Sequence, residues 1–149
     1  MQPLRESVHD RQVSARVLNL VNEARSRPRR CGNHTFEAAK PLTLNPQLRR
    51  AALEHSQEMA TYSFTRHQGR DGSTPGQRVT RAGYQWTAVA ENVAVGPGTA
   101  EEVMAVWLAS SAHCANIMSA RYRDLGVAVV VSGQDGRRVY WTLSLAAPR

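Results

Sequence analysis

Three side chains stand out because their types do acid–base or metal chemistry. His67 lies in the glycine-containing loop 66–72 (RHQGRDG), Glu91 lies in the triplet AEN, and His113 directly precedes Cys114. Histidine titrates near neutral pH and ligates metals, and a carboxylate orients an imidazole or accepts a proton. The two histidines are far apart in the chain, so spacing alone does not unite them. Each of them, taken singly, is also typical of a surface or capping histidine.

The two cysteines, Cys31 and Cys114, do not have the spacing of a CxxC metal or redox motif. Two buried thiols and one disulfide both remain open, and we favour the disulfide. Closing a loop of this length removes about 4.5 kcal/mol of unfolded-chain entropy in the loop-closure model, and the bond persists only in an oxidising compartment. A free Cys114 acting as a nucleophile with His67 as its base is a minor alternative.

Apolar periodicity predicts helices first and strands towards the end of the chain. Candidate helices cover about 10–27, 46–61, 75–83 and 99–109. Candidate strands cover about 89–95, 127–131 and 139–145, with a turn at Asp135-Gly136. Asn45-Pro46 and Thr74-Pro75-Gly76-Gln77 are start signals for two of these helices. Because no βαβ crossover pattern is present, the predicted class is α+β, with helices packed against a small antiparallel sheet.

Three further segments carry structural expectations. His55 lies on the apolar stripe of the second helix, which is more typical of a hydrogen-bonded core histidine than of a ligand. The stretch 28–41 is irregular, polar and longer than most connections, so it must be pinned, and Cys31 is the candidate pin. The basic segment 25–30 (RSRPRR) is interpreted as a solvated surface cluster.

Length and composition limit the class of protein. A chain of 149 residues forms one domain, and 42% hydrophobic with 21% charged residues is typical of a folded globular chain. No apolar run approaches the roughly 18 residues of a membrane span, so we expect no transmembrane anchor. The net charge is +7. Nucleic acid is not an expected partner, because no helix-turn-helix, zinc finger or aromatic-rich RNA-binding motif accompanies that charge.

Several short motifs occur in one order along the chain. They are HSQEMA at 55–60, HQGRDGSTPGQR at 67–78, GY at 83–84, ENVA at 91–94, WLASSAH at 107–113 and YWT at 140–142. This order resembles the CAP superfamily, which contains cysteine-rich secretory proteins, insect antigen 5 and plant pathogenesis-related proteins, and it is most similar to single-domain bacterial members. The resemblance implies a three-layer α-β-α sandwich with a small central antiparallel sheet. This domain would cover residues 13–149, after an N-terminal extension of residues 1–12.

The resemblance also implies a metal site. In the family, two histidines and two glutamates line a central cleft that binds zinc or another divalent metal, and three of these positions fall on His67, Glu91 and His113. The fourth position aligns with Ser110, so one acid is missing, and Ser110 and Asn92 are expected to be neighbours in the cleft. Two imidazoles leave coordination positions open for water, so we expect modest zinc affinity.

The remaining groups have supporting roles in this prediction. Glu91 would orient a water molecule, accept its proton or hold an imidazole N–H. A disulfide between Cys31 and Cys114 would tether the backbone of His113.

Two functions follow from the resemblance. The favoured one is an exported, non-catalytic binding module for lipid, sterol or another cell-envelope component. The alternative is a zinc-dependent, protease-like hydrolase in which Glu91 is the catalytic base for an activated water. Residues 1–6 (MQPLRE) lack the apolar region of a signal peptide. We therefore expect a secreted or periplasmic protein whose signal peptide is removed, and we expect a monomer.

Overall fold

The computed structural model describes residues 8–133 and 136–149, and a four-stranded sheet with the order β3-β5-β6-β4 lies at its centre. The strands of this sheet are β3 (Thr43–Leu44), β4 (Trp86–Val95), β5 (Asp124–Val131) and β6 (Val139–Pro148). The helices are α1 (Val8–Arg25), α2 (Pro46–Tyr62), α3 (Pro75–Arg81), α4 (Ala100–Ala109) and α5 (Ser111–Met118). A separate hairpin consists of β1 (Arg29–Cys31) and β2 (His34–Phe36).

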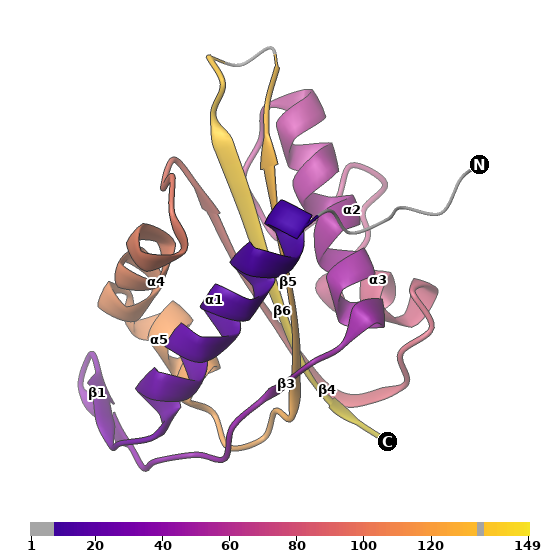
Figure 1. Ribbon diagram of the computed structural model, residues 1–149. Helices are drawn as coiled ribbons and strands as arrows, with labels where there is room; N and C mark the ends of the chain where they lie inside the picture. The colour runs from indigo at the N-terminus through magenta and orange to yellow at the C-terminus, as the bar shows by residue number, and fades with distance from the viewer. Residues whose placement is uncertain (1–7, 134–135) are drawn as a thin grey trace.

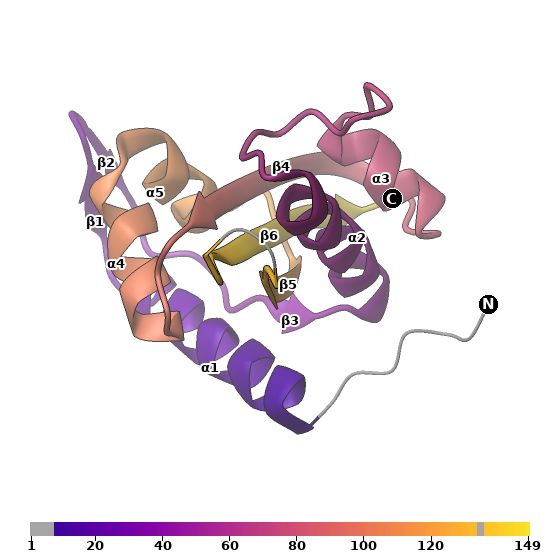
Figure 2. The same ribbon diagram turned by 90° about the horizontal axis from the view of Figure 1, so that it is seen from above.

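Helices cover both faces of the sheet (Figures 1 and 2). Helices α2 and α3 lie on one face, and α1, α4 and α5 lie on the other. Alternate side chains of a strand point to opposite faces, and β6 uses both. Leu143 and Leu145 of β6 join the core beneath α1, α4 and α5, whereas Tyr140 and Ala146 join the clusters beneath α2 and α3. The predicted α+β class and three-layer α-β-α sandwich are confirmed.

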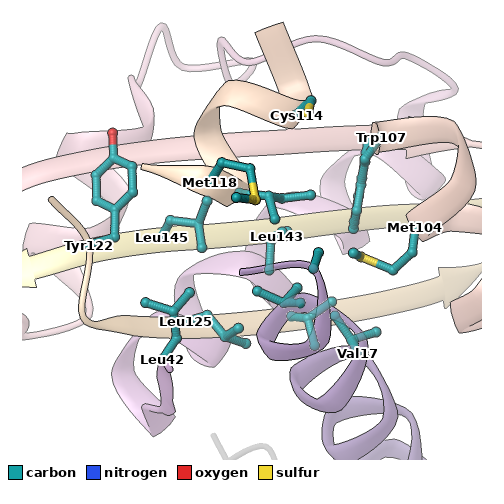
Figure 3. Packing of buried hydrophobic residues seen from close by; sticks show 14 of the residues in the cluster. Val17, Leu42, Met104, Trp107, Cys114, Met118, Tyr122, Leu125, Leu143 and Leu145 are labelled. Atoms are coloured by element: carbon teal, nitrogen blue, oxygen red, sulfur yellow. The ribbon is translucent and has the colours of Figure 1, made fainter. Parts of the chain in front are cut away.

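The larger core lies between the sheet and the helices α1, α4 and α5 (Figure 3). Val17 of α1, Trp107 of α4 and Leu143 of β6 are all 0% exposed. Each large apolar side chain that is fully buried contributes about 1.5–3 kcal/mol. This packing fixes α4 and α5 against the sheet, and it thereby places the start of α5, where His113 lies.

Two helices begin at the capping residues that the sequence indicates. The side chain of Asn45 accepts hydrogen bonds from the backbone N–H groups of Gln47 and Leu48 at the start of α2. Thr74 and Gln77 form both hydrogen bonds of a capping box at the start of α3. An N-cap of this kind contributes about 1 kcal/mol. The capping box therefore fixes the end of the loop between α2 and α3 at the first turn of α3.

Three parts of the backbone differ from the sequence-based expectation. The stretch 28–41 contains the hairpin β1–β2 and is not irregular throughout. The chain breaks at Ser110, whose extended backbone separates α4 from a further helix, α5. Strand β3 pairs with β5 in parallel, whereas the pairings of β6 with β4 and β5 are antiparallel as predicted. Elements of two or three residues are too short to show a hydrophobic period.

The disulfide between Cys31 and Cys114 is confirmed, and it joins the hairpin to α5. The two Cα atoms are 5.5 Å apart, and both cysteines are buried. Since the sulfur of Cys114 is oxidised, it is not the nucleophile of the minor alternative. The disulfide therefore pins the long 28–41 segment, as expected, to the helix that carries His113.

Arg25 corrects the interpretation of the segment 25–30 as a solvated cluster. Its side chain is 1% exposed, and its guanidinium donates to the carbonyl oxygens of Lys40, Ile117 and Ser119 at 2.7–2.8 Å. The carbonyls at the end of a helix carry partial negative charge, so the end of α5 suits a cation. Arg25 is thus a second pin between the 28–41 segment and α5.

The ends of two elements complete the description. Helix α1 begins at Val8, inside the segment 1–12 that the sequence assigns to an extension, and residues 1–7 lie outside the described residues. Asp135 of the predicted turn also lies outside them. Within the described part of the chain, no helix is both long and apolar enough to cross a bilayer.

Candidate functional site

The predicted cleft residues gather around β4, which is the strand at one edge of the sheet (Figure 2). Glu91 and Asn92 are consecutive residues of β4, so their side chains point to opposite faces. Glu91 contacts His67 from the loop between α2 and α3, whereas Asn92 contacts the backbone of His113 in α5. Two neighbouring residues of one edge strand thus hold segments that come from opposite layers.

Glu91 is a buried carboxylate with both of its oxygens engaged. Its side chain is 3% exposed. Oε1 accepts a hydrogen bond from Nδ1 of His67 at 3.0 Å, and Oε2 accepts one from Nη2 of Arg78 at 2.6 Å. Because Nδ1 of His67 carries the proton of this bond, Nε2 of the neutral ring keeps a free lone pair. The His67 ring is therefore oriented to offer Nε2 to a ligand.

Arg78 compensates the charge of the buried Glu91 carboxylate. Its guanidinium also donates to the backbone carbonyls of His67 at 2.7 Å and Ser73 at 3.0 Å. An uncompensated buried charge costs several kcal/mol, whereas the planar guanidinium serves several acceptors at once. Arg78 is not among the residues that sequence patterns single out. The available signal was its position at the end of the HQGRDGSTPGQR motif, one turn after the Thr74 cap.

His67 is the exposed member of the site, with 54% of its side chain accessible. The hydrogen bond to the Glu91 carboxylate raises the pKa of His67 above its ordinary value, and partial burial and the charge of Arg78 oppose this effect without reversing it. A metal ion at His67 must compete with a proton. Metal binding there would therefore be coupled to pH.

His113 is held through its backbone and is half-buried. Nδ2 of Asn92 donates to the carbonyl oxygen of His113 at 3.1 Å, and Asn116 donates in turn to Oδ1 of Asn92 at 2.9 Å. Nδ1 of the His113 ring is buried without a hydrogen-bond partner. Burial lowers the pKa of His113, and the charge of His67 lowers it further. The charge of His67 thus acts on the His113 ring in the same direction as burial.

Ser110 lies at the break between α4 and α5, where it is the N-cap residue of α5. Its side chain makes no capping hydrogen bond, and its backbone carbonyl accepts from the N–H of Cys114 at 2.8 Å. The position that carries an acid in the family thus carries a short hydroxyl here. This end of the site has no carboxylate at position 110 to serve as a further metal ligand.

His55 is a core histidine, as its position on the apolar stripe indicates. Its side chain is 0% exposed, and Nε2 donates to the carbonyl oxygen of Arg66 at 2.7 Å. The same nitrogen is 3.8 Å from Oε1 of Glu91, and burial lowers the pKa of His55. His55 therefore supports the loop that carries His67 and remains inaccessible to a ligand from solvent.

His67 has the hydrogen-bonding pattern of a metal-ligating histidine. Ligating histidines typically donate their second ring N–H to a carboxylate, as His67 does to Glu91. The unpartnered Nδ1 of His113 is a further polar atom that lacks a partner. Across residues 8–133 and 136–149, however, no group of three or more His, Cys, Asp or Glu side chains is arranged to hold a metal ion. A divalent ion here would take its other ligands from water or from a partner.

Comparisons with known proteins give the fold and the family. An uncharacterized protein from Bacillus subtilis strain 168, YkwD, is 29% identical over 118 residues, which make up 79% of this chain and 42% of YkwD. The crystal structure of an extracellular protein containing an SCP domain from Bacillus anthracis superposes with a TM-score of 0.76 at 20% identity, over 98% of this chain and 45% of that one. This chain thus spans less than half the length of these two relatives.

An outer surface protein from Borrelia burgdorferi matches along its whole length. Its structure superposes with a TM-score of 0.74 at 15% identity, over 99% of this chain and 98% of that one. The family model described as the cysteine-rich secretory protein family, CAP, matches residues 18–145. Since this match covers most of the chain, the protein belongs to the CAP family of cysteine-rich secretory proteins.

Proposed function

We propose that this CAP domain is an exported, non-catalytic binding module. Its cleft would hold a divalent cation, zinc by preference, between His67 and His113, next to a bound lipid, sterol or other cell-envelope component. The observation that carries the proposal is the double engagement of Glu91, whose oxygens are bonded to His67 and Arg78. A carboxylate held in this way orients an imidazole, and because it is 3% exposed and already accepts a hydrogen bond on each oxygen, it is poorly placed to take a proton from water.

The chemistry of the two rings supports the cation. Neutral imidazole is a good ligand for zinc, and a carboxylate behind the ring fixes its orientation. When bound, the ion would supply positive charge that attracts an anionic or polar group of the ligand. His67 and His113 would hold it, and the open positions would be filled from outside the chain. Affinity is therefore modest in the absence of the partner.

Export is supported by the disulfide and by one similar protein. The Cys31–Cys114 bond is buried, and structural disulfides persist in oxidising compartments. The similar Bacillus anthracis protein is described as extracellular. We therefore place the function of this domain outside the cytoplasm.

The zinc-dependent hydrolase is the alternative that the same residues allow. It needs Glu91 to accept a proton from water, and the burial of this carboxylate and its bonds to His67 and Arg78 disfavour that step. Incubation of metal-loaded protein with a mixed library of peptides and esters separates the two functions. We expect no turnover above that of the Glu91→Gln variant. Turnover that this variant abolishes would overturn the non-catalytic proposal.

Calorimetric titration with zinc chloride tests the metal site. We expect saturable binding to the wild-type protein and its loss in His67→Ala and in His113→Ala. Glu91→Gln should weaken binding by about 10–100-fold, as expected for the loss of a carboxylate that orients a ligand. His34→Ala is the matched control, because His34 is an exposed histidine on the β1–β2 hairpin. Unchanged binding in both alanine variants would refute the site.

A further inference from the structure

A groove of about 790 Å³ lies between α3 and β4, and the function proposed above does not use it. One part of its lining is apolar and consists of Trp86, Val89 and Ala90 of β4. Another part is polar and consists of Asp71, Gln77 and Arg81, from α3 and the loop before it. Neither His67 nor His113 lines this groove, so it is a separate place on the molecule.

The hydrogen bonds of Trp86 leave only the apolar surface of its indole ring for contact with a ligand in the groove. Its Nε1 donates to Oγ1 of Thr80 at 2.9 Å and to the carbonyl oxygen of Gly76 at 3.2 Å, so its only polar atom is used within the protein. The indole lies against Gly76, where an added Cβ would be 2.7 Å from Cζ2. Glycine at this position lets the indole approach α3, and Trp86 remains half-buried at the groove.

The polar lining offers both donors and acceptors without net charge. Asp71 accepts hydrogen bonds from Ser73 and from Arg81, both at 2.9 Å, and these bonds lower the pKa of Asp71 to about 2. The carboxylate is thus ionised and its charge is balanced by Arg81. Oε1 of Gln77 accepts from the backbone of Thr74, which leaves the amide N–H groups of Gln77 as donors.

We infer that this groove binds a saccharide. A sugar ring has an apolar C–H face that stacks on an aromatic ring, and its hydroxyl groups both donate and accept hydrogen bonds. A lipid chain would cover Asp71, Gln77 and Arg81 without bonding them, and burying polar groups without partners is unfavourable. A strongly charged ligand would meet a balanced ion pair. The mixed lining therefore matches an uncharged glycan best.

The groove also lies beside the cleft. Val89 lines the groove, and Glu91, which follows two residues later on the same face of β4, holds His67. A glycan in the groove would therefore lie near His67. The residues that bind it would differ from those that bind the metal ion. Saccharide binding and metal binding are separable, because different side chains carry them.

Intrinsic fluorescence tests the saccharide site directly. Of the three tryptophans, Trp107 and Trp141 are buried in the core, so a ligand in the groove perturbs only Trp86. We titrate the protein with N-acetylglucosamine trimer and with maltotriose up to about 10 mM, so that a dissociation constant of about 1 mM is still measured. A saturable change in emission with either trisaccharide supports the inference. No saturable change with both would overturn it.

Calorimetric titration of two variants locates the binding site, with the trisaccharide that changes the fluorescence as the ligand. Trp86→Phe keeps an aromatic ring but loses the Nε1 hydrogen bonds, and Gly76→Ala displaces the indole. We expect each variant to weaken binding of the trisaccharide at least fivefold. The melting temperature of each variant shows whether it is folded. Thr61→Ala, on the exposed end of α2, is the control. Unchanged affinity in both groove variants would overturn the inference.

Two further measurements separate the outcomes. If phosphatidylcholine vesicles change the Trp86 emission and the trisaccharides do not, the groove is a lipid site and the saccharide inference fails. Zinc calorimetry on Trp86→Phe should match the wild-type protein. A failed metal titration with intact saccharide binding would refute the proposed function alone.

Discussion

The two histidines of the candidate site are held by different kinds of interaction. His67 is exposed, and a hydrogen bond from its ring to Glu91 orients it and raises its pKa. His113 is half-buried, its backbone is bonded to Asn92, its Nδ1 has no partner, and burial lowers its pKa. The ring of one is therefore fixed by charge, and the main chain of the other is fixed by packing and by a neighbouring disulfide.

This difference means that the two histidines and their surroundings, the His67 half and the His113 half of the candidate site, respond to different changes. The His67 half depends on the ion pair between Glu91 and Arg78. The His113 half depends on α5, which is tied to β1 through Cys31–Cys114. A change in charge should therefore act on His67, and a change in covalent structure should act on His113.

The largest expected effect comes from the double variant Cys31→Ser/Cys114→Ser. Its free energy of unfolding should fall by about 4.5 kcal/mol, because the unfolded chain regains the entropy of an open loop. Urea denaturation measures this loss. In NMR spectra of the folded fraction, the ring resonances of His113 should shift and those of His67 should not. Equal shifts at both rings would contradict the separation of the two halves.

Glu91→Gln tests the other half. The buried guanidinium of Arg78 loses its counter-charge, so the free energy of unfolding should fall by about 3 kcal/mol, at the lower end for a broken buried pair because glutamine keeps the shape. The pKa of His67 should fall towards its ordinary value. Urea denaturation and NMR titration measure the two effects. Glu54→Gln is the control, since Glu54 is half-exposed and its nearest cation, Arg81, is at 3.7 Å.

The smallest expected effect is on the pH dependence of stability. Folding lowers the pKa of His113 below its ordinary value of 6.5. The contribution of His113 to the free energy of unfolding is therefore present above pH 6.5 and is lost as the pH falls through the pKa of the folded state. Folding raises the pKa of His67. Its contribution to the free energy of unfolding is therefore present below pH 6.5 and is lost as the pH rises through the pKa of the folded state.

Unfolding free energies measured from about pH 5 to pH 8 should therefore change in opposite directions in two matched variants. His113→Gln should flatten the rise of stability with pH, and His67→Gln should steepen it. His55, which is buried with a lowered pKa, is present in both variants and cancels in the comparison. Slopes that change in the same direction would show that the two rings do not differ as described.

Elements with clear periodicity were predictable from the sequence, and short ones were not. The alternation of Val139, Trp141, Leu143 and Leu145 with Tyr140, Thr142 and Ser144 predicts β6. The Asn45 and Thr74 caps predict the starts of α2 and α3. Helix α5 follows α4 with only one residue between them, so a single stripe does not reveal the break at Ser110. Strands β1, β2 and β3 have two or three residues each, which is too few to show a repeated alternation of apolar and polar residues.

The sequence indicated the candidate site residues through the family resemblance, but it did not indicate their hydrogen bonds. The family resemblance supplies His67, Glu91 and His113, and the fold brings the two histidines to the same strand edge. The pairing of Glu91 with Arg78 depends on the three-dimensional path of the loop before α3. An arginine in a chain rich in arginine carries no pattern that marks it as buried, so charge counting alone would not find it.

The arrangement of Glu91 and Asn92 has a consequence for how this domain tolerates change. The contacts of Glu91 with His67 and of Asn92 with His113 both depend on the register of one strand pair, in which Glu91 lies opposite Ser144 and Asn92 opposite Leu143. A shift of the register by one residue would turn Glu91 towards α5 and Asn92 towards α3, so both side chains would lose their present partners together. Insertions or deletions in β4 should therefore be far more damaging than most substitutions there.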